Sequence, residues 1–205
     1  MLSGTIRVRF RKTGDLKFIS HLDLMRFLTR ALVRAKIPVA YTEGFNPHPK
    51  LTFGLPLSVG TESVCELMEL RIEGEMASED FLDALNACLP EDLRADRAYI
   101  APAGRKLSAI AWAEYEVRTD RSIDPDRHLS GSIPVCKQTK SGEKTVDIAP
   151  LIKRYDYDGE ILRLVLSADS QHYLNPETVV KLFAPEDYSV RRTRLFCQDG
   201  ETEFT

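Results

Sequence analysis

The first half of this chain contains a regular succession of strand and helix patterns, and their order restricts the folds available to it. Residues 5–11 alternate apolar and basic side chains, which is typical of a strand with one buried face. Apolar residues then recur at helical spacing between the N-cap residue Ser20 and the break at Pro38. We expect strand 5–11, helix 20–36, strands 39–42 and 63–73, helix 78–88 and strand 97–102. The order β-α-β-β-α-β predicts a ferredoxin-like (split βαβ) unit.

The second half is rich in strand patterns and has one clear helix pattern near its end. The pattern changes at residues 103–107, so we expect one unit over residues 1–103 and a second over residues 104–205. Its expected elements are strands 112–119, 133–140, 144–148, 160–168 and 188–197, a helical turn within 148–155 and a helix from Asn175 to Phe183. Ser141 and Gly142 predict a hairpin turn. The predicted fold class is α+β, with tandem ferredoxin-like units of which the second is degenerate.

The composition is that of a protein with an ordinary hydrophobic core, because 43% of the residues are hydrophobic and 29% are charged. We find no apolar run long enough to span a bilayer, so we expect no membrane partner. The four cysteines lie too far apart in sequence to form a CxxC cluster, and we expect no zinc or iron–sulfur site from them. Reduced thiols of this kind predict a cytoplasmic protein.

The charges are distributed unevenly along the chain. Residues 1–50 carry ten Lys and Arg but three Asp and Glu, a balance of +7, whereas the rest of the chain is acidic. A basic segment on an acidic body is typical of a surface that binds a polyanion. The predicted phosphate contacts are Arg7, Arg9, Arg11, Arg26, Arg30 and Arg34. The alternative is that these arginines only form the water-exposed faces of a strand and a helix and bind no phosphate.

The stretch Gly44–Lys50 predicts a stiff loop that holds polar groups at fixed angles. Pro47 and Pro49 fix their own backbone and restrict the residues before them. In a split βαβ unit we expect this loop to share one end of the sheet with the start of the helix at Ser20. The predicted substrate-binding residues are Ser20, His21, Asp23, Gly44, Phe45, Asn46, His48 and Lys50.

Two of the four histidines, His21 and His48, belong to this predicted site and are the candidate catalytic residues. The alternatives are a capping role for His21 and a turn role for His48. The carboxylates Asp23 and Glu43 are near in sequence, but the spacing matches no known metal signature, and we predict no metal site. The chain lacks nucleotide-binding and hydrolase motifs, and we predict no cofactor.

Two long motifs resemble a known bacterial family. The segments Lys17–Arg26 and Ala40–Lys50 are similar to the radical SAM-linked domain family, a domain of unknown function, and the similarity returns at Leu51–Leu57 and Val146–Ile152. Members of that family are often fused to, or encoded beside, a radical SAM enzyme. The resemblance implies a radical SAM partner in trans, because this chain has no CxxxCxxC cluster of its own.

Together these observations predict an accessory protein that binds RNA, either tRNA or rRNA, for modification by a radical SAM enzyme. The sequence leaves open whether the chain is itself an enzyme, and a role without catalysis of its own is preferred. One alternative is a metal-independent ribonuclease with tandem ferredoxin-like units that uses His21 or His48. The other is a protein-docking module that binds no RNA.

Overall fold

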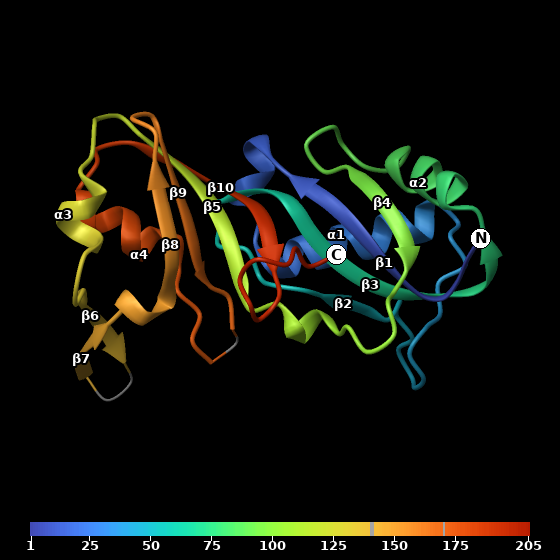
Figure 1. The fold of residues 1–205 in the computed structure, drawn as a ribbon. Coiled ribbons are helices and arrows are strands. Elements are labelled where there is room, and N and C mark those ends of the chain that lie inside the picture. The colour runs from blue at the N-terminus through green and yellow to red at the C-terminus, as the bar shows by residue number, and fades with distance from the viewer. Residues whose placement is uncertain (140–141, 170) are drawn as a thin grey trace. The chain divides into compact units, whose positions relative to one another are not determined.

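Antiparallel strands make up most of the regular structure in the computed structural model, which describes residues 1–139, 142–169 and 171–205 (Figure 1). The chain divides into two units, Met1–Ala109 and Ile110–Thr205. The predicted α+β class is confirmed, since the sheets are mainly antiparallel and the helices are few. Within the described ranges, none of the helices has the length and apolar character that a membrane crossing requires.

The first unit is a four-stranded sheet with two helices. Its elements are β1 (Leu2–Lys12), α1 (His21–Arg34), β2 (Leu51–Phe53), β3 (Glu62–Met76), α2 (Ser78–Asn86) and β4 (Ala95–Ile100). Across the sheet the strand order is β4-β1-β3-β2, and each neighbouring pair is antiparallel. The alternating side chains Ile6, Val8 and Phe10 are buried in one core with the apolar faces of α1 and α2. Both helices therefore cover the same face of this sheet.

The ends of α1 follow from its sequence. Ser20 is the N-cap, and its side-chain oxygen accepts a hydrogen bond from the Asp23 backbone N–H at 3.1 Å. At the other end Lys36 adopts a positive φ of 54°, a conformation that usually favours glycine. The Ile37 N–H then donates to the Leu32 carbonyl oxygen at 3.2 Å, and Pro38 follows. The predicted helix is confirmed with both of its boundaries close to those expected.

The edge strand that follows α1 differs from the prediction, which placed a complete strand at residues 39–42. Val39 forms only an isolated bridge to Ile72 on β3. The chain then leaves the sheet, pairs Tyr41 with Pro49, and returns to β3 as β2. The loop therefore interrupts the edge strand in its middle instead of following its end.

Within the second unit the strands follow the order β10-β5-β9-β8 with antiparallel pairing, and β6 and β7 form a separate hairpin. The elements are β5 (Trp112–Thr119), α3 (Pro125–Leu129), β6 (Pro134–Thr139), β7 (Gly142–Asp147), β8 (Ile152–Tyr157), β9 (Ile161–Ser167), α4 (Pro176–Val180) and β10 (Tyr188–Phe196). The predicted hairpin strands are present, and its turn residue Ser141 lies outside the described residues. The short helix α3 was not predicted.

The helical turn predicted within residues 148–155 is wrong for most of its length. Only Ala149–Leu151 forms a 3₁₀ turn, and β8 begins at the next residue. β8 pairs with β9 along the edge of the sheet, so the backbone hydrogen bonds of that pairing outweigh the local helical preference.

Candidate functional site

Residues 41–50, here called the loop hairpin, form a closed hairpin at the edge of the first sheet. The Thr42 N–H donates to the His48 carbonyl oxygen at 2.9 Å, and the His48 N–H donates to the Thr42 hydroxyl at 3.2 Å. The imidazole Nδ1 of His48 lies 3.2 Å from the carbonyl oxygen of Asn46. Gly44 occupies the turn with a φ of 122°, which only glycine adopts without strain. The loop that was predicted to be stiff is therefore closed by hydrogen bonds between its two arms.

The tip of the loop hairpin presents an aromatic side chain to solvent. Phe45 is fully exposed, and Tyr41 at the base of the same hairpin is about half exposed. A single exposed apolar residue is ordinary on a protein surface. Here the residue stands on a hydrogen-bonded hairpin, so Phe45 offers an exposed aromatic face for stacking or insertion.

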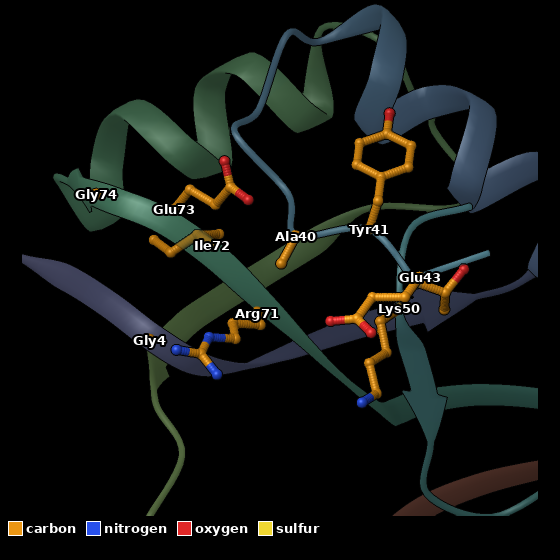
Figure 2. A pocket seen from close by; sticks show the side chains of 10 residues that line it. Gly4, Ala40, Tyr41, Glu43, Lys50, Arg71, Ile72, Glu73 and Gly74 are labelled. Carbon is orange, nitrogen blue, oxygen red and sulfur yellow. The ribbon is translucent and has the colours of Figure 1, made fainter. Parts of the chain in front are cut away.

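A cleft of about 790 Å³ lies between the loop hairpin and the end of β3. It is lined by Gly4, Ala40, Tyr41, Thr42, Glu43, Lys50, Arg71, Ile72, Glu73 and Gly74, and we call it the β3 cleft. Figure 2 shows Arg71 on β3 and Lys50 and Glu43 on the loop hairpin around it, while Tyr41 and Glu73 point away from the two cations. The volume lies in the range of roughly 300–1,000 Å³ that small ligands and nucleotide-sized groups occupy.

The two cations of the β3 cleft are available for a ligand. Among the residues that the structure describes, neither Lys50 nor Arg71 has an ion-pair partner, and both are exposed. An ammonium and a guanidinium without carboxylate partners provide eight N–H donors for an anion. Glu43 adds a carboxylate acceptor beside them, so the β3 cleft can hold a ligand that carries both anionic and amino groups.

The start of α1 is a separate place in the first unit. Ser20 and Asp23 satisfy the first turn of the helix, and Asp23 also lies 3.3 Å from Arg26. The ring of His21 packs edge-on against Phe53, with 5.3 Å between the ring centroids. All these residues therefore have a local structural partner.

The prediction that the loop and the start of α1 share one end of the sheet needs correction. His21 contacts Phe53, whereas the loop hairpin closes at Pro49, four residues earlier on the same edge. Four residues of extended chain span about 13 Å. The predicted site therefore divides into two places, and His21 and His48 are not brought together. The reason is that the loop leaves the middle of the edge strand, near the level of Leu70, instead of its end.

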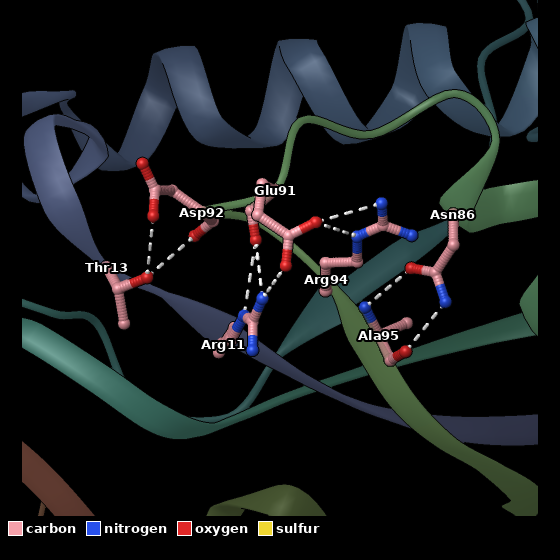
Figure 3. Close-up of polar contacts among 7 residues, drawn as sticks. All are labelled: Arg11, Thr13, Asn86, Glu91, Asp92, Arg94 and Ala95. Atoms are coloured by element: carbon pink, nitrogen blue, oxygen red, sulfur yellow. Dashed lines mark hydrogen bonds and ion pairs between the residues drawn. The ribbon is translucent and has the colours of Figure 1, made fainter.

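The three arginines on β1 are bound to acids within the first unit. The pairs are Arg7 with Glu69, Arg9 with Asp96 and Arg11 with Glu91. Figure 3 shows Arg11 held by both the carbonyl oxygen and the carboxylate of Glu91. Arg7 is completely buried, with its guanidinium 2.6 Å from Glu69. Its side chain has no exposed surface to offer a phosphate, so the predicted contact at Arg7 needs correction.

The arginines of α1 differ from one another. Arg26 pairs with Asp23, and Arg34 donates to the carbonyl oxygen of Cys88 at 2.6 Å. Arg30 is exposed and has no ion-pair partner within the described parts of the chain. At least four of the ten cations in the first 50 residues thus have a carboxylate partner, and the cations without an ion-pair partner among the described residues include Arg30 and Lys50.

Arg71 is a site residue that the sequence did not indicate. It stands between the buried residues Leu70 and Ile72 on β3, where an alternating strand normally places a solvated charge. The pairing of β3 with the edge strand places it in the same cleft as Lys50. The only signal in the sequence was a charged residue between two apolar residues of a strand. That pattern occurs at many exposed strand positions, so it does not single out Arg71.

Comparison with known proteins places the chain among bacterial proteins of undescribed activity. The family model with the description "Uncharacterized protein conserved in bacteria (DUF2344)" matches residues 5–176, which is most of the chain. No curated protein matches the sequence.

Proposed function

We propose that this chain, which belongs to the DUF2344 family, is an accessory protein that binds single-stranded RNA through the loop hairpin and the β3 cleft. Phe45 stacks on a base, and Lys50 and Arg71 bind the phosphates that flank it. Glu43 accepts a hydrogen bond from a base amino group. The chemistry of modification belongs to a separate enzyme.

One observation carries this proposal. A fully exposed aromatic ring stands on a closed hairpin whose other residues line a cleft, and the two cations of that cleft have no ion-pair partner in the described residues. Aromatic stacking combined with uncompensated cations is the usual chemistry of single-strand recognition. A duplex, by comparison, keeps its bases stacked on one another and would leave Phe45 without a partner.

The proposal includes a ferredoxin-like arrangement in both units. In support, the strand order β4-β1-β3-β2 and the antiparallel pairings are those of a split βαβ unit. The order β10-β5-β9-β8 repeats the same scheme, with the β6–β7 hairpin inserted before β8.

The proposed enzyme partner is a radical SAM enzyme acting in trans in the cytoplasm. The support is the resemblance of Lys17–Arg26 and Ala40–Lys50 to the radical SAM-linked domain family. The four free cysteines, one of them the exposed Cys136, suit a reducing compartment. Co-elution of this chain with a radical SAM enzyme from the same genome tests the partnership, and separate elution at micromolar concentration would contradict it.

RNA binding is tested by fluorescence anisotropy with a labelled single-stranded RNA of mixed sequence and with a labelled tRNA. Replacing Phe45 with serine should cost about 1–3 kcal/mol of binding free energy, the usual contribution of one stacked base. Phe18→Ser is the matched control, because Phe18 is also exposed but lies outside the loop hairpin and the β3 cleft. Absence of binding by the wild type, or equal losses in both variants, would overturn the proposal.

The ribonuclease alternative predicts a different result in the same samples. RNA cleavage in EDTA by the wild type, abolished by His48→Ala, would favour it over simple binding. The separation of His21 from His48 gives this alternative no pair of histidines to divide the roles of acid and base.

A further inference from the structure

The outer face of α1 carries an apolar stripe that the core does not use. Leu22 and Val33 are 53% and 50% exposed. They are eleven positions apart in α1, so their directions around the helix axis differ by about 20° and they lie about 16 Å apart along it. Thr29 lies between them along the axis, about 20° from Leu22 and about 40° from Val33 around it. The stripe of Leu22, Thr29 and Val33, here called the α1 stripe, spans three turns.

The α1 stripe is distinct from the buried face of the same helix. Leu24, Leu28, Ala31 and Leu32 already supply the side chains that α1 buries. The outer face of a surface helix is normally polar throughout. Moreover, every large apolar side chain that is exposed among the described residues belongs to the first unit. Two of them, Leu22 and Val33, lie on one face of α1, and an apolar face of a helix is a surface on which a partner helix can pack.

The charges beside the α1 stripe identify the kind of partner. Arg26 and Arg30 lie about 40° and 80° from Leu22 around the helix, on one flank of the stripe. The ion pair of Arg26 with Asp23 is exposed and is worth little, while Arg30 has no ion-pair partner in the residues that the structure describes. This flank of the α1 stripe therefore carries a net positive charge. It is complementary in charge to a partner surface with acidic side chains.

A second copy of this chain is a poor occupant of the same face. Antiparallel pairing of two α1 helices would oppose Leu22 with Val33 and would place Arg26 beside Arg30 of the copy. Two arginines in that position repel each other, so the pairing that buries the apolar residues is electrostatically unfavourable. The complement of the α1 stripe is a different sequence, with acids where this helix has arginines.

We propose that the α1 stripe docks an amphipathic helix of a partner protein, with glutamate or aspartate residues beside its apolar positions. Apolar side chains of that helix cover Leu22 and Val33 over three turns, and its carboxylates face Arg26 and Arg30. This docking is independent of RNA binding, because none of these four residues lines the β3 cleft or belongs to the loop hairpin.

The experiment places a photo-crosslinking residue on the α1 stripe of the full chain in the bacterium that makes it. Thr29→p-benzoylphenylalanine reports on the stripe. Phe27→p-benzoylphenylalanine is the matched control, since Phe27 lies about 140° from Leu22 on the same helix. The crosslinked peptide is identified by mass spectrometry. We expect a crosslink at position 29 and not at position 27, to a segment of another protein with an acidic amphipathic helical pattern.

Two variants make the result decisive. Leu22→Ser with Val33→Ser, and separately Arg26→Glu with Arg30→Glu, should each lower the crosslink yield by about tenfold, the size of effect that central interface residues produce. Both should keep the melting temperature and the RNA affinity of the wild type. Equal crosslinking at the two positions, a crosslink to RNA or to a second copy, a partner segment without acids, or an unchanged yield in the variants would overturn the proposal.

Discussion

Arg7 is a fully buried cation that forms an ion pair with Glu69. Its Nε and Nη2 atoms lie 3.0 Å and 2.6 Å from the same oxygen of Glu69, and it also donates to the carbonyl oxygen of Arg105. Burial raises the pKa of the nearby Tyr99 hydroxyl, and the positive charge of Arg7 acts in the opposite direction. A buried charge is costly without a partner, so Glu69 is a stabilising residue although part of its side chain is exposed.

Replacing Glu69 with alanine should lower the free energy of unfolding by about 2–3 kcal/mol, because it leaves the Arg7 guanidinium buried without its carboxylate. The measurement is urea denaturation followed by circular dichroism. Asp96→Ala is the matched control on the same sheet face, since the Arg9–Asp96 pair is exposed and should contribute less than about 1 kcal/mol. Equal losses in the two variants would contradict a special role for the buried pair.

At the level of elements, the turn between β8 and β9 is organised by one carboxylate. Asp158 accepts hydrogen bonds from the backbone N–H groups of Ile161 at 2.8 Å and Glu160 at 3.0 Å, and Arg163 lies 2.9 Å away. These donors favour the ionised carboxylate, and they lower the pKa of Asp158 to about 2. The turn is therefore most stable when Asp158 is charged.

The lowered pKa of Asp158 predicts a pH dependence of stability. A carboxylate whose pKa is lower in the folded state adds stability above its unfolded pKa, and this addition is lost as the pH falls from about 4 to about 2. Asp158→Asn retains a side-chain acceptor without the charge. The difference in urea midpoint between wild type and Asp158→Asn should be present at pH 6 and shrink towards pH 2. A difference that does not change over this range would count against the charge as its cause.

Elements defined by local chemistry were predicted well from the sequence. The alternation of Ile6, Val8 and Phe10 correctly assigned the buried face of the first strand, and Ser20 correctly marked the start of α1. These features depend on residues that are close in sequence, where spacing alone decides which face is buried. The same reasoning predicted a loop at Gly44–Lys50, although not the hydrogen bonds between Thr42 and His48 that close it into a hairpin.

The composition of the site depends on contacts between distant segments, and the sequence could not supply these. The pairing of Val39 with Ile72, more than thirty residues apart, decides where the loop hairpin leaves the sheet. That register separates His48 from His21 and places Arg71 and Lys50 in the same cleft. Ion pairs across strands, such as Arg7 with Glu69, likewise turned predicted phosphate ligands into structural residues.

For the whole molecule, internal ion pairing limits how strongly RNA binding can depend on salt. If Lys50 and Arg71 make the phosphate contacts, the logarithm of the binding constant should fall with the logarithm of salt concentration with a slope of about −1.4. Contacts from all six predicted arginines would instead give a slope near −4. Lys50→Ala with Arg71→Ala should bring the slope close to zero. If the slope stays steep in this double variant, RNA binds to another part of the chain and not to the β3 cleft.

If the loop hairpin binds RNA as proposed, the hydrogen bonds between Thr42 and His48 also affect how fast it binds. Because the hairpin is already closed in the free chain, its backbone does not need to be ordered after an encounter. Stopped-flow mixing should therefore give an observed rate that rises linearly with RNA concentration, with no slower first-order phase. A plateau at high RNA concentration would reveal a rearrangement step. Thr42→Val removes the hydroxyl acceptor for the His48 N–H and should introduce such a plateau. One hydroxyl group would then decide whether RNA binds in a single step or only after the hairpin has closed.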